Sequence, residues 1–413
     1  MVRKKVFWII IIILLSRNLA GCAGYLQSTQ GARARFDKGL FLDASIEYKK
    51  GLKHPGRDYL LYLLDTGLSL HYAGRYEESN NFLLEADKYA EEINYISITR
   101  ETASLLATDY TLKYRGEDYE KILINTYLAI NYLMLGDYEN ARVEAKRVNE
   151  KIGKYNSDGE LNYKLNPFSI YLSGIIYEIN GEPNDAYIDY KKVYDLLPNF
   201  PLVKKDLIRL STLLNFDDDY KTWRTRFDLK DIKQDDHSNG ELIFIFQCGY
   251  SPQKHQEMRV IAVPAYHPRL SIISYAKVYI NGEYYDQTYI LEDIERTAID
   301  QLNAKIARII AKQTAVSAGK YVIANTIGKE TNQPIVRDIL LLFFYATNEA
   351  DLRSWLTLPQ NIQISRISLP EGNYQVMVKF YDKNHMFVEQ KIWSDVKIGK
   401  NGHKTTLNYR AIR

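Results

Sequence analysis

The N-terminal half of this chain repeats one spacing of small residues, glycine and bulky residues, and this spacing restricts the fold more than any other feature. A small residue is followed seven positions later by glycine, two later by a bulky residue and three later by another small residue. The copies are Ala32, Gly39, Phe41, Ala44; Gly67, Gly74, Tyr76, Ser79; Ala129, Gly136, Tyr138, Ala141; and Gly174, Gly181, Pro183, Ala186. The spacing predicts helical hairpins, because small residues let two helices approach and glycine ends the first helix before the turn.

This unit resembles the tetratricopeptide repeat, a helical hairpin with a period of about 34 residues. The first two copies begin 35 residues apart, whereas the later ones are more widely separated. We therefore expect extra helical material within 94–125, including a helix over Tyr95 to Tyr110. An unrelated helical bundle is the alternative.

Stacked hairpins of this kind form a curved array, and the resemblance implies that its concave side binds a segment of a partner protein. Tyr132 and Tyr171 lie on the first helices of their pairs, which makes them candidates for this binding surface. The same positions also suit the helical core, so both readings stay open.

Residues 1–21 have the features of a secretory signal peptide. Cations at positions 3–5 precede ten apolar residues, Val6 to Leu15, a run too short to span a bilayer as a helix. The following Leu19-Ala20-Gly21-Cys22 resembles a bacterial lipobox. An ordinary signal peptide with a chance cysteine is the alternative.

The lipobox resemblance implies that Cys22 is acylated and becomes the new N-terminus, with residues 22–30 as a tether. Several acyl chains on one cysteine anchor a protein stably to a membrane. Ala23 follows the cysteine. In enteric bacteria an aspartate at this position retains lipoproteins at the inner membrane, so the alanine favours the outer membrane, facing the periplasm.

Composition restricts the function classes. Loss of residues 1–21 removes four cations and no acids, which takes the formal charge from +3 to slightly negative and gives no argument for nucleic-acid binding. Only Cys248 remains beside Cys22, so an acylated chain has no intrachain disulfide. The sequence has no P-loop, HExxH, nucleophile elbow or CxxC. We therefore expect no enzymatic activity, no cofactor and no metal.

The expected fold class is α+β. Helical repeats over 31–215 are followed by a linker over 216–240 and a mixed, β-rich C-terminal domain over 241–413. The linker is inferred from acidic and polar residues, including 234–240, which contains no apolar residue. Leu242 to Phe246 is an apolar run suited to a buried strand.

Further strands and turns are expected in the C-terminal domain. Met258 to Val263 reads as a strand ended by a proline. Tyr275 to Ile280 runs into Asn281-Gly282, which predicts a hairpin with Tyr284 to Ile290 as the return strand. The alternating pattern from 361 to 409 resembles a small β-sandwich module.

Two helices are expected between these strands. Leu291 to about Ile327 carries apolar residues on two stripes, which predicts a buried helix, and Asp338 to Thr347 predicts a second one. Insertion into a membrane or an oligomeric seam is the alternative for the long helix. Its lysines argue against a membrane span.

Asp351, Arg353 and Trp355 are the strongest candidates for a binding site in this half. An acid, an arginine and a tryptophan close together can hold a sugar or a peptide carboxylate by stacking and paired hydrogen bonds. They can equally hold a loop through an internal ion pair with the indole as its lid. Lys254 and Tyr266 are candidates for the same surface.

As a whole the chain resembles a family of bacterial outer-membrane lipoproteins with tetratricopeptide repeats and a C-terminal mixed α/β domain. Residues 114–121 with 136–145, 249–254 with 263–266, and 350–359 carry the likeness. It implies a location and a binding role in cell-envelope biogenesis rather than a reaction.

We therefore predict a membrane-anchored, non-enzymatic scaffold or adaptor that binds an envelope protein through its repeats, with its oligomeric state left open. A glycan-acting envelope enzyme and a subunit of a secretion or surface-polymer export complex are the alternatives.

Overall fold

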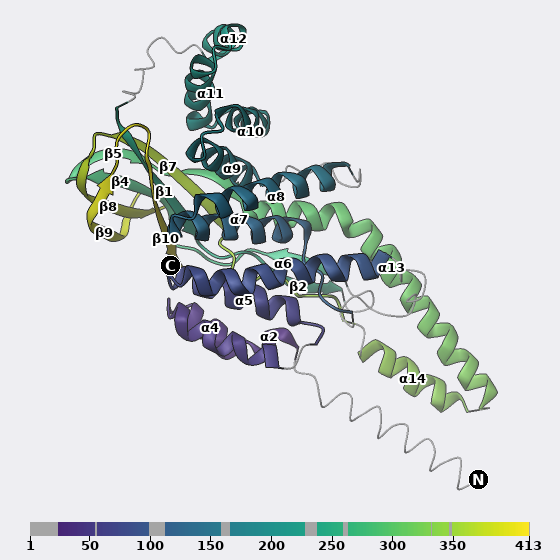
Figure 1. Cartoon of the computed structure of the whole chain (residues 1–413). Helices are drawn as coiled ribbons and strands as arrows, with labels where there is room; N and C mark the ends of the chain where they lie inside the picture. The colour runs from purple at the N-terminus through teal and green to yellow at the C-terminus, as the bar shows by residue number, and fades with distance from the viewer. Residues whose placement is uncertain are drawn as a thin grey trace.

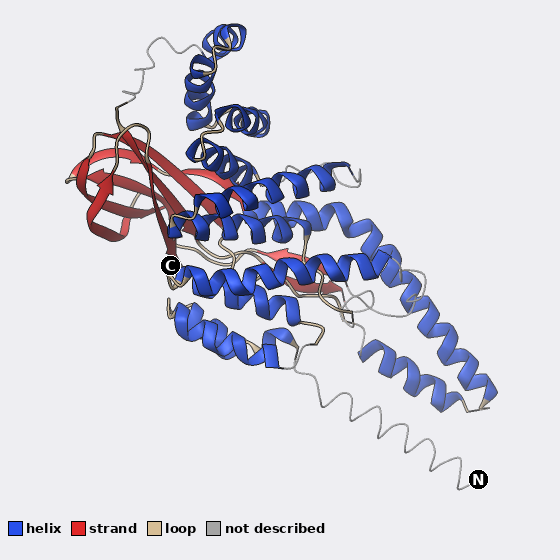
Figure 2. Ribbon diagram, in the orientation of Figure 1, coloured by secondary structure: helices blue, strands red, loops and turns tan. Residues whose placement is uncertain are grey.

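The first half of the chain folds into stacked helices, and the second half into sheets with a long helical hairpin (Figures 1 and 2). The computed structural model describes residues 24–53, 56–98, 112–157, 166–227, 238–258, 263–331, 333–346 and 349–412. The expected signal peptide, Cys22 and most of the expected helix over 95–110 lie outside these residues.

The helices stack as pairs that follow the predicted repeats. After the short α2 (Tyr25–Ser28), the pairs are α3 (Gln30–Phe36) with α4 (Phe41–Lys49), α5 (Tyr59–Tyr72) with α6 (Tyr76–Ile98), α7 (Asp118–Leu135) with α8 (Tyr138–Ser157), α9 (Pro167–Ile179) with α10 (Pro183–Leu196), and α11 (Pro201–Leu213) with α12 (Asp217–Phe227). A 3₁₀ turn, η1 (Lys50–Lys53), follows α4. The helical hairpins predicted from the repeated spacing are confirmed.

The glycine at the same position of each copy is explained by the backbone conformation of the turn. The four repeat glycines have φ between 71° and 75°, a left-handed conformation that costs glycine nothing and other residues more. The small residues earlier in each copy permit close packing. A Cβ on Gly174 would lie 2.4 Å from the Tyr190 ring, and one on Gly67 would lie 2.8 Å from Leu83.

The first pair is completed by the far end of the chain. Ala32, Phe36, Ala44 and Tyr48 form a small core of their own, and Ile412 packs against it. The C-terminal end of the described chain therefore lies against the first helix pair of the array.

The helical array is longer than predicted at both ends. Residues 217–227, expected to be linker, form α12, whose three aspartates stand in the first turn, where they favour a helix N-terminus. In the turn between α11 and α12, Asn215 has a φ of 56° and occupies the left-handed position that glycine has in the four copies. At the other end, Tyr25 in the expected tether is 2% exposed and already belongs to the helical core.

The C-terminal half contains two four-stranded sheets and a two-stranded ribbon. The strands are β1 (Gly240–Cys248), β2 (Gln253–Met258), β3 (Val263–His267), β4 (Ile273–Ile280), β5 (Glu283–Gln287), β6 (Tyr289–Asp293), β7 (Asn361–Leu369), β8 (Gly372–Asp382), β9 (Phe387–Ile398) and β10 (Lys404–Ala411). The first sheet has the order β10-β1-β7-β6, the second β5-β4-β8-β9, and β2 pairs with β3. β10 runs parallel to β1, and the other pairs are antiparallel.

The first sheet is covered on both faces, which explains the unbroken apolar run in β1. Leu242, Phe244 and Phe246 belong to the core shared with the second sheet, whereas Ile243 and Ile245 belong to the core shared with the helices. Successive side chains of a strand point to opposite faces, so a strand covered on both faces needs apolar residues at every position.

Several strand predictions require correction. Of the strand expected over Met258 to Val263, residues 259–262 lie outside the described part of the chain, and the two end residues belong to different strands, β2 and β3. Pro264 lies inside this two-stranded ribbon, where a missing N–H is tolerated. The return strand over 284–290 divides into β5, which pairs with β4, and β6, which pairs with β7. The sandwich is built by the whole domain, and its last four strands are shared between both sheets.

α13 (Ile294–Glu330) and α14 (Pro334–Ala346) form a hairpin that projects from the body (Figure 1). The prediction that the long helix is buried is correct in part: Ile294, Ala298 and Leu302 are buried at its start, and Val316 and Ala324 are buried farther along. Beyond the first turns α14 covers one side alone, so Tyr321 is 57% and Val322 60% exposed. Among the described residues, no helix has the length and apolarity needed to cross a membrane.

Candidate functional site on the inner face of the repeats

The inner face of the array, formed by α5, α7 and α9, is covered by the C-terminal half (Figure 1). One apolar core joins the two, since Leu64 of α5 and Leu128 of α7 share it with Ile245 of β1 and Ile364 of β7. Around this core lie polar contacts that connect residues more than a hundred positions apart, and most of the sequence-predicted candidates take part in them.

Glu117, which precedes α7, is held by two lysines of the C-terminal half. Lys254 Nζ donates to its Oε1 at 2.7 Å, and Lys305 Nζ donates to its Oε2 at 3.3 Å. Burial alone would raise the pKa of Glu117, but the two ammonium groups lower it well below its usual range. Lys254 also lies 5.2 Å from the centre of the Tyr266 ring, so these two predicted residues meet against α7.

Arg353 ties the segment after α14 to the start of α5. Its guanidinium donates to both oxygens of Asp351 at 2.8 Å, and to Asp58 Oδ1 at 3.0 Å. The carbonyl of Leu112 accepts a further bond at 3.1 Å, and the Tyr114 ring lies 5.3 Å below the guanidinium. The side chain of Arg353 is 3% exposed, so this is an internal ion pair.

Trp355 is buried in the same seam. Its backbone N–H donates to Glu120 Oε1 at 2.7 Å, and its indole N–H donates to Thr357 Oγ1 at 2.9 Å. Thr357 Oγ1 donates to Asp65 Oδ1 at 2.7 Å, and the Tyr25 hydroxyl donates to the other oxygen of Asp65. Burial raises the pKa of the Asp65 carboxyl to about 6.

Asp351, Arg353 and Trp355 therefore lie together, with Lys254 and Tyr266 close by. Of the two readings left open by the sequence, the structure shows the internal ion pair with a buried indole. Ligand binding by these side chains would require the segment to leave the inner face.

A second polar group lies where β1 and β10 cross α5 and α7. Gln247 Oε1 accepts from the hydroxyls of Tyr72 at 2.9 Å and Tyr127 at 2.7 Å. Its Nε2 donates to Asn408 Oδ1 at 2.8 Å and lies 3.1 Å from His71 Nε2.

His71 in this group is neutral. Asn131 Oδ1 lies 2.5 Å from His71 Nδ1 and can only accept, which assigns the proton to Nδ1 and leaves Nε2 to accept from Asn408 Nδ2 at 2.9 Å. Burial lowers the pKa of His71 to about 4. The imidazole thus serves as a fixed acceptor between the two halves.

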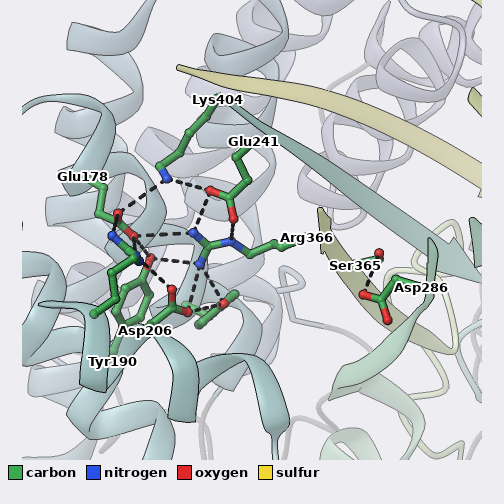
Figure 3. Close-up of polar contacts among 10 residues, drawn as sticks. Glu178, Tyr190, Asp206, Glu241, Asp286, Ser365, Arg366 and Lys404 are labelled. Atoms are coloured by element: carbon green, nitrogen blue, oxygen red, sulfur yellow. Dashed lines mark hydrogen bonds and ion pairs between the residues drawn. The ribbon is translucent and has the colours of Figure 1, made fainter. Parts of the chain in front are cut away.

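The third group is a buried charge cluster at α9 and α11 (Figure 3). Arg366 of β7 donates to Glu241 Oε1 at 2.6 Å and to Asp206 Oδ2 at 2.9 Å, and lies 3.6 Å from Glu178. Lys404 of β10 lies 2.7 Å from Glu241 and 3.4 Å from Glu178, and Arg209 lies 2.8 Å from Glu178.

Three carboxylates and three cations therefore balance inside this cluster. Burial alone would raise the pKa of Glu241, but Arg366 and Lys404 lower it to about 2. The cluster joins the helical half to both β7 and β10.

The two predicted tyrosines of the inner face differ. Tyr171 is fully buried, donates to Asp206 Oδ2 at 2.5 Å and accepts from Arg366 at 2.8 Å. Tyr132 stands apart from the clusters, half-buried on α7 against the helical core. Tyr171 thus does contact a partner segment, but that segment is part of its own chain.

Sequence reasoning missed the polar residues that make the seam, above all Gln247, His71 and Arg366. A signal was present, because Gln247 stands near the end of the apolar run of β1 and His71 is a polar residue in a leucine-rich helix. Buried polar side chains need partners, but their identity is set by pairing across the fold.

Metal ligands, a free thiol and buried acids are the side chains of the described residues to consider for catalysis. No group of three or more His, Cys, Asp or Glu among them is placed to hold a metal ion. Burial raises the pKa of the Cys248 thiol to about 12, so it is protonated at neutral pH. The buried acids of the seam are engaged by lysine, arginine or hydroxyl donors.

Comparison with known proteins finds likeness in structure alone. No protein-family model and no curated protein sequence matches the chain. It is similar to a crystal structure of MamA, at 15% identity and a TM-score of 0.32, over 47% of this chain and 91% of that one. It is also similar to a tetratricopeptide repeat protein from Parabacteroides merdae, at 14% identity and a TM-score of 0.33, over 50% of this chain and 68% of that one. The fold itself is a tetratricopeptide-like helical region followed by a sheet-rich one.

Proposed function

We propose that this chain is a lipid-anchored lipoprotein of the bacterial outer membrane that acts as a non-enzymatic protein-binding scaffold in cell-envelope biogenesis. One observation carries the scaffold part: the inner face of the repeats is filled by the chain's own C-terminal half. The polar side chains that a repeat array usually offers to a partner are used to fix the two halves together, as Arg366 does with Asp206. Partners then bind to the outer helices.

Three of the four copies carry an exposed apolar residue at the same position of the outer helix, where the second copy has Asn81. Ile46, Val143 and Ile188 each stand two positions after the last small residue of their copy, and are 51%, 44% and 45% exposed. An apolar residue repeated at one register of a stacked array forms a surface that a partner can follow from pair to pair.

The scaffold is tested by site-specific photo-crosslinking in intact cells. A photoreactive residue is placed at 46, 143 or 188, and, as a control, at Leu270, which is 96% exposed on the C-terminal half. We expect one protein adduct shared by the three repeat positions and missing at 270. Absence of adducts from all three positions, in a chain that is folded and correctly located, would refute the scaffold.

The anchor is supported by the sequence at Cys22 and by the short distance from it to folded structure. Tyr25 is only three positions later and is tied to Asp65 of α5. An acyl group on residue 22 therefore holds the helical body directly at the membrane surface.

The anchor is tested with Cys22→Ser. We expect the wild-type chain to incorporate labelled palmitate and to sediment with outer membranes, and the variant to take up no label. Equal labelling of both chains would contradict acylation at Cys22.

A further inference from the structure

The projecting part of the α13–α14 hairpin leaves uncharged and apolar side chains in water. On α14, Ile335, Ile339 and Leu342 are 66%, 47% and 69% exposed. Their spacing of four and three places them on one face of the helix, which also carries Asp338, 59% exposed and paired with Arg337 at 2.7 Å. A helix of this kind on the surface of a globular protein normally turns charged residues outward.

The outward side of α13 has the same character. Between 310 and 326, every exposed residue is uncharged: Ile310, Ala311, Thr314, Ala315, Ala318, Tyr321, Val322 and Thr326. The side toward α14 is close-packed, since a Cβ on Gly328 would lie 2.7 Å from Arg337 Cβ. α14 therefore covers one side of α13 and leaves the apolar exposure of both helices without cover.

The hairpin also carries an excess of positive charge. From Ile294 to Ala346 it contains seven lysine and arginine residues and four acids, and the stretch 301–329 contains Lys305, Arg308, Lys312, Lys320 and Lys329 without any aspartate or glutamate. Lys305 is used at the base, where it binds Glu117. Arg308, Lys312 and Lys329 follow along the projecting arm, and Lys320 Nζ lies 5.9 Å from the centre of the Phe344 ring of α14.

Apolar side chains beside a row of lysines and arginines are the pattern of helices that lie in the interface of a membrane, because the apolar side enters the acyl boundary and the cations meet anionic headgroups. A partner protein or a second copy would be expected to match the apolar face with one of its own, but neither requires the excess of positive charge. The charge thus favours lipid as the occupant.

We propose that the α13–α14 hairpin binds the surface of an anionic lipid bilayer, with the face of Ile335, Ile339 and Leu342 in the interface and the basic residues of α13 at the headgroups. The hairpin lies in the plane of the interface and does not span it. This second contact deepens the proposed lipid anchoring, since α2, next to Cys22, and α14 both lie along the lower edge of the molecule in Figure 1. It fixes the orientation of the repeats relative to the membrane.

The test separates the hairpin from the acyl anchor. The chain that begins at residue 22 and carries Cys22→Ser, so that no acyl group is present, is mixed with vesicles of phosphatidylcholine alone or of an equal mixture with phosphatidylglycerol. Vesicle-bound protein is measured by flotation. The variant is Ile335→Gln with Ile339→Gln and Leu342→Gln, all at exposed positions.

A matched control replaces three exposed apolar residues elsewhere by glutamine. Leu270, Ile272 and Met386 are 96%, 59% and 65% exposed. Circular dichroism establishes that each chain is folded. We expect binding to the phosphatidylglycerol vesicles that weakens with salt, a loss of at least about tenfold in the hairpin variant, and no change in the control.

Three outcomes overturn the proposal. They are absence of binding to either vesicle, equal loss in the hairpin variant and the control, and a wild-type oligomer that the hairpin variant dissolves without any vesicle binding. The last outcome assigns the face to a second copy. None of them bears on palmitate labelling of Cys22, so the failure of either membrane contact is recognised separately.

Discussion

Replacement of Arg366 by methionine tests whether the buried charge cluster holds the two halves together. Methionine keeps most of the apolar stem and removes the cation that lies 2.6 Å from Glu241 and 2.9 Å from Asp206. The side chains of Arg366 and Asp206 are only 5% and 6% exposed, so water cannot replace the lost partner. Removal of one member of a buried ion pair costs about 3–5 kcal/mol, and we expect a loss of this size here.

The loss is measured by urea unfolding followed by tryptophan fluorescence, with Arg337→Met as the control. Arg337 also pairs with an acid, Asp338, but the two side chains are 44% and 59% exposed, and such a surface pair contributes about 1 kcal/mol or less. If both variants lose equally little, the reasoning from burial is wrong.

The pH dependence gives a second check. In the wild-type chain the folded-state pKa of Glu241 is lowered to about 2, so its stabilising contribution is present above the unfolded pKa and is lost as the pH falls toward 2. Without Arg366, burial raises that pKa again. The penalty of Arg366→Met should therefore be largest at neutral pH and shrink below about pH 4.5. A penalty that is constant with pH would refute an electrostatic origin.

Two further predictions concern packing and burial of a lone acid. Gly174→Ala should destabilise the fold by about 1–3 kcal/mol, because its Cβ would lie 2.4 Å from the Tyr190 ring. Gly153→Ala in α8 has open space at the Cβ and should stabilise the fold by up to about 1 kcal/mol. Thermal unfolding that gives both variants the same sign would contradict the assignment of the repeat contacts. Burial raises the pKa of Glu292 from 4.5 to about 8, and its carboxyl accepts a hydrogen bond from the Thr297 hydroxyl at 2.9 Å. Between these two pH values the folded state retains a proton that the unfolded state releases. The free energy of unfolding therefore falls as the pH rises from about 4.5 to about 8. Glu292→Gln should flatten that fall, and an unchanged slope of unfolding free energy between about pH 5 and 8 would exclude Glu292 as its source.

Local features of the helical half could be predicted from the sequence. The glycine positions follow from backbone conformation within a few residues, and all four repeat glycines have the positive φ that the turn requires. α12 was missed because Asp217 to Asp219 resemble a solvated linker, although acids in a first turn equally favour a helix.

Contacts between distant residues could not be predicted. The group of His71, Gln247 and Asn408 joins three elements whose approach depends on the parallel pairing of β10 with β1, which no local pattern indicates. The same holds for Asp351 and Arg353, whose residue types suit a ligand site or an ion pair equally well, and only the position of α5 decides between them.

The exposure of α13 was missed for a related reason. Its apolar stripes indicate that something covers the helix, and a sequence analysed by itself suggests the protein core. α14 covers only one side of α13, so some of the apolar residues in these stripes, such as Ile310 and Val322, remain exposed.

The parallel pairing of β10 with β1 and the packing of Ile412 on the first helix pair also determine the order in which the chain can be completed during synthesis. Chains emerge N-terminus first at about 5–20 residues per second, so the stretch of roughly 160 residues between β1 and β10 takes on the order of ten to thirty seconds to appear. The helices made first are thus among the last to be finished. A chain that is released before residue 404 lacks both β10 and Ile412. One edge of β1 is then without its strand partner, and the first helix pair is without the packing of Ile412.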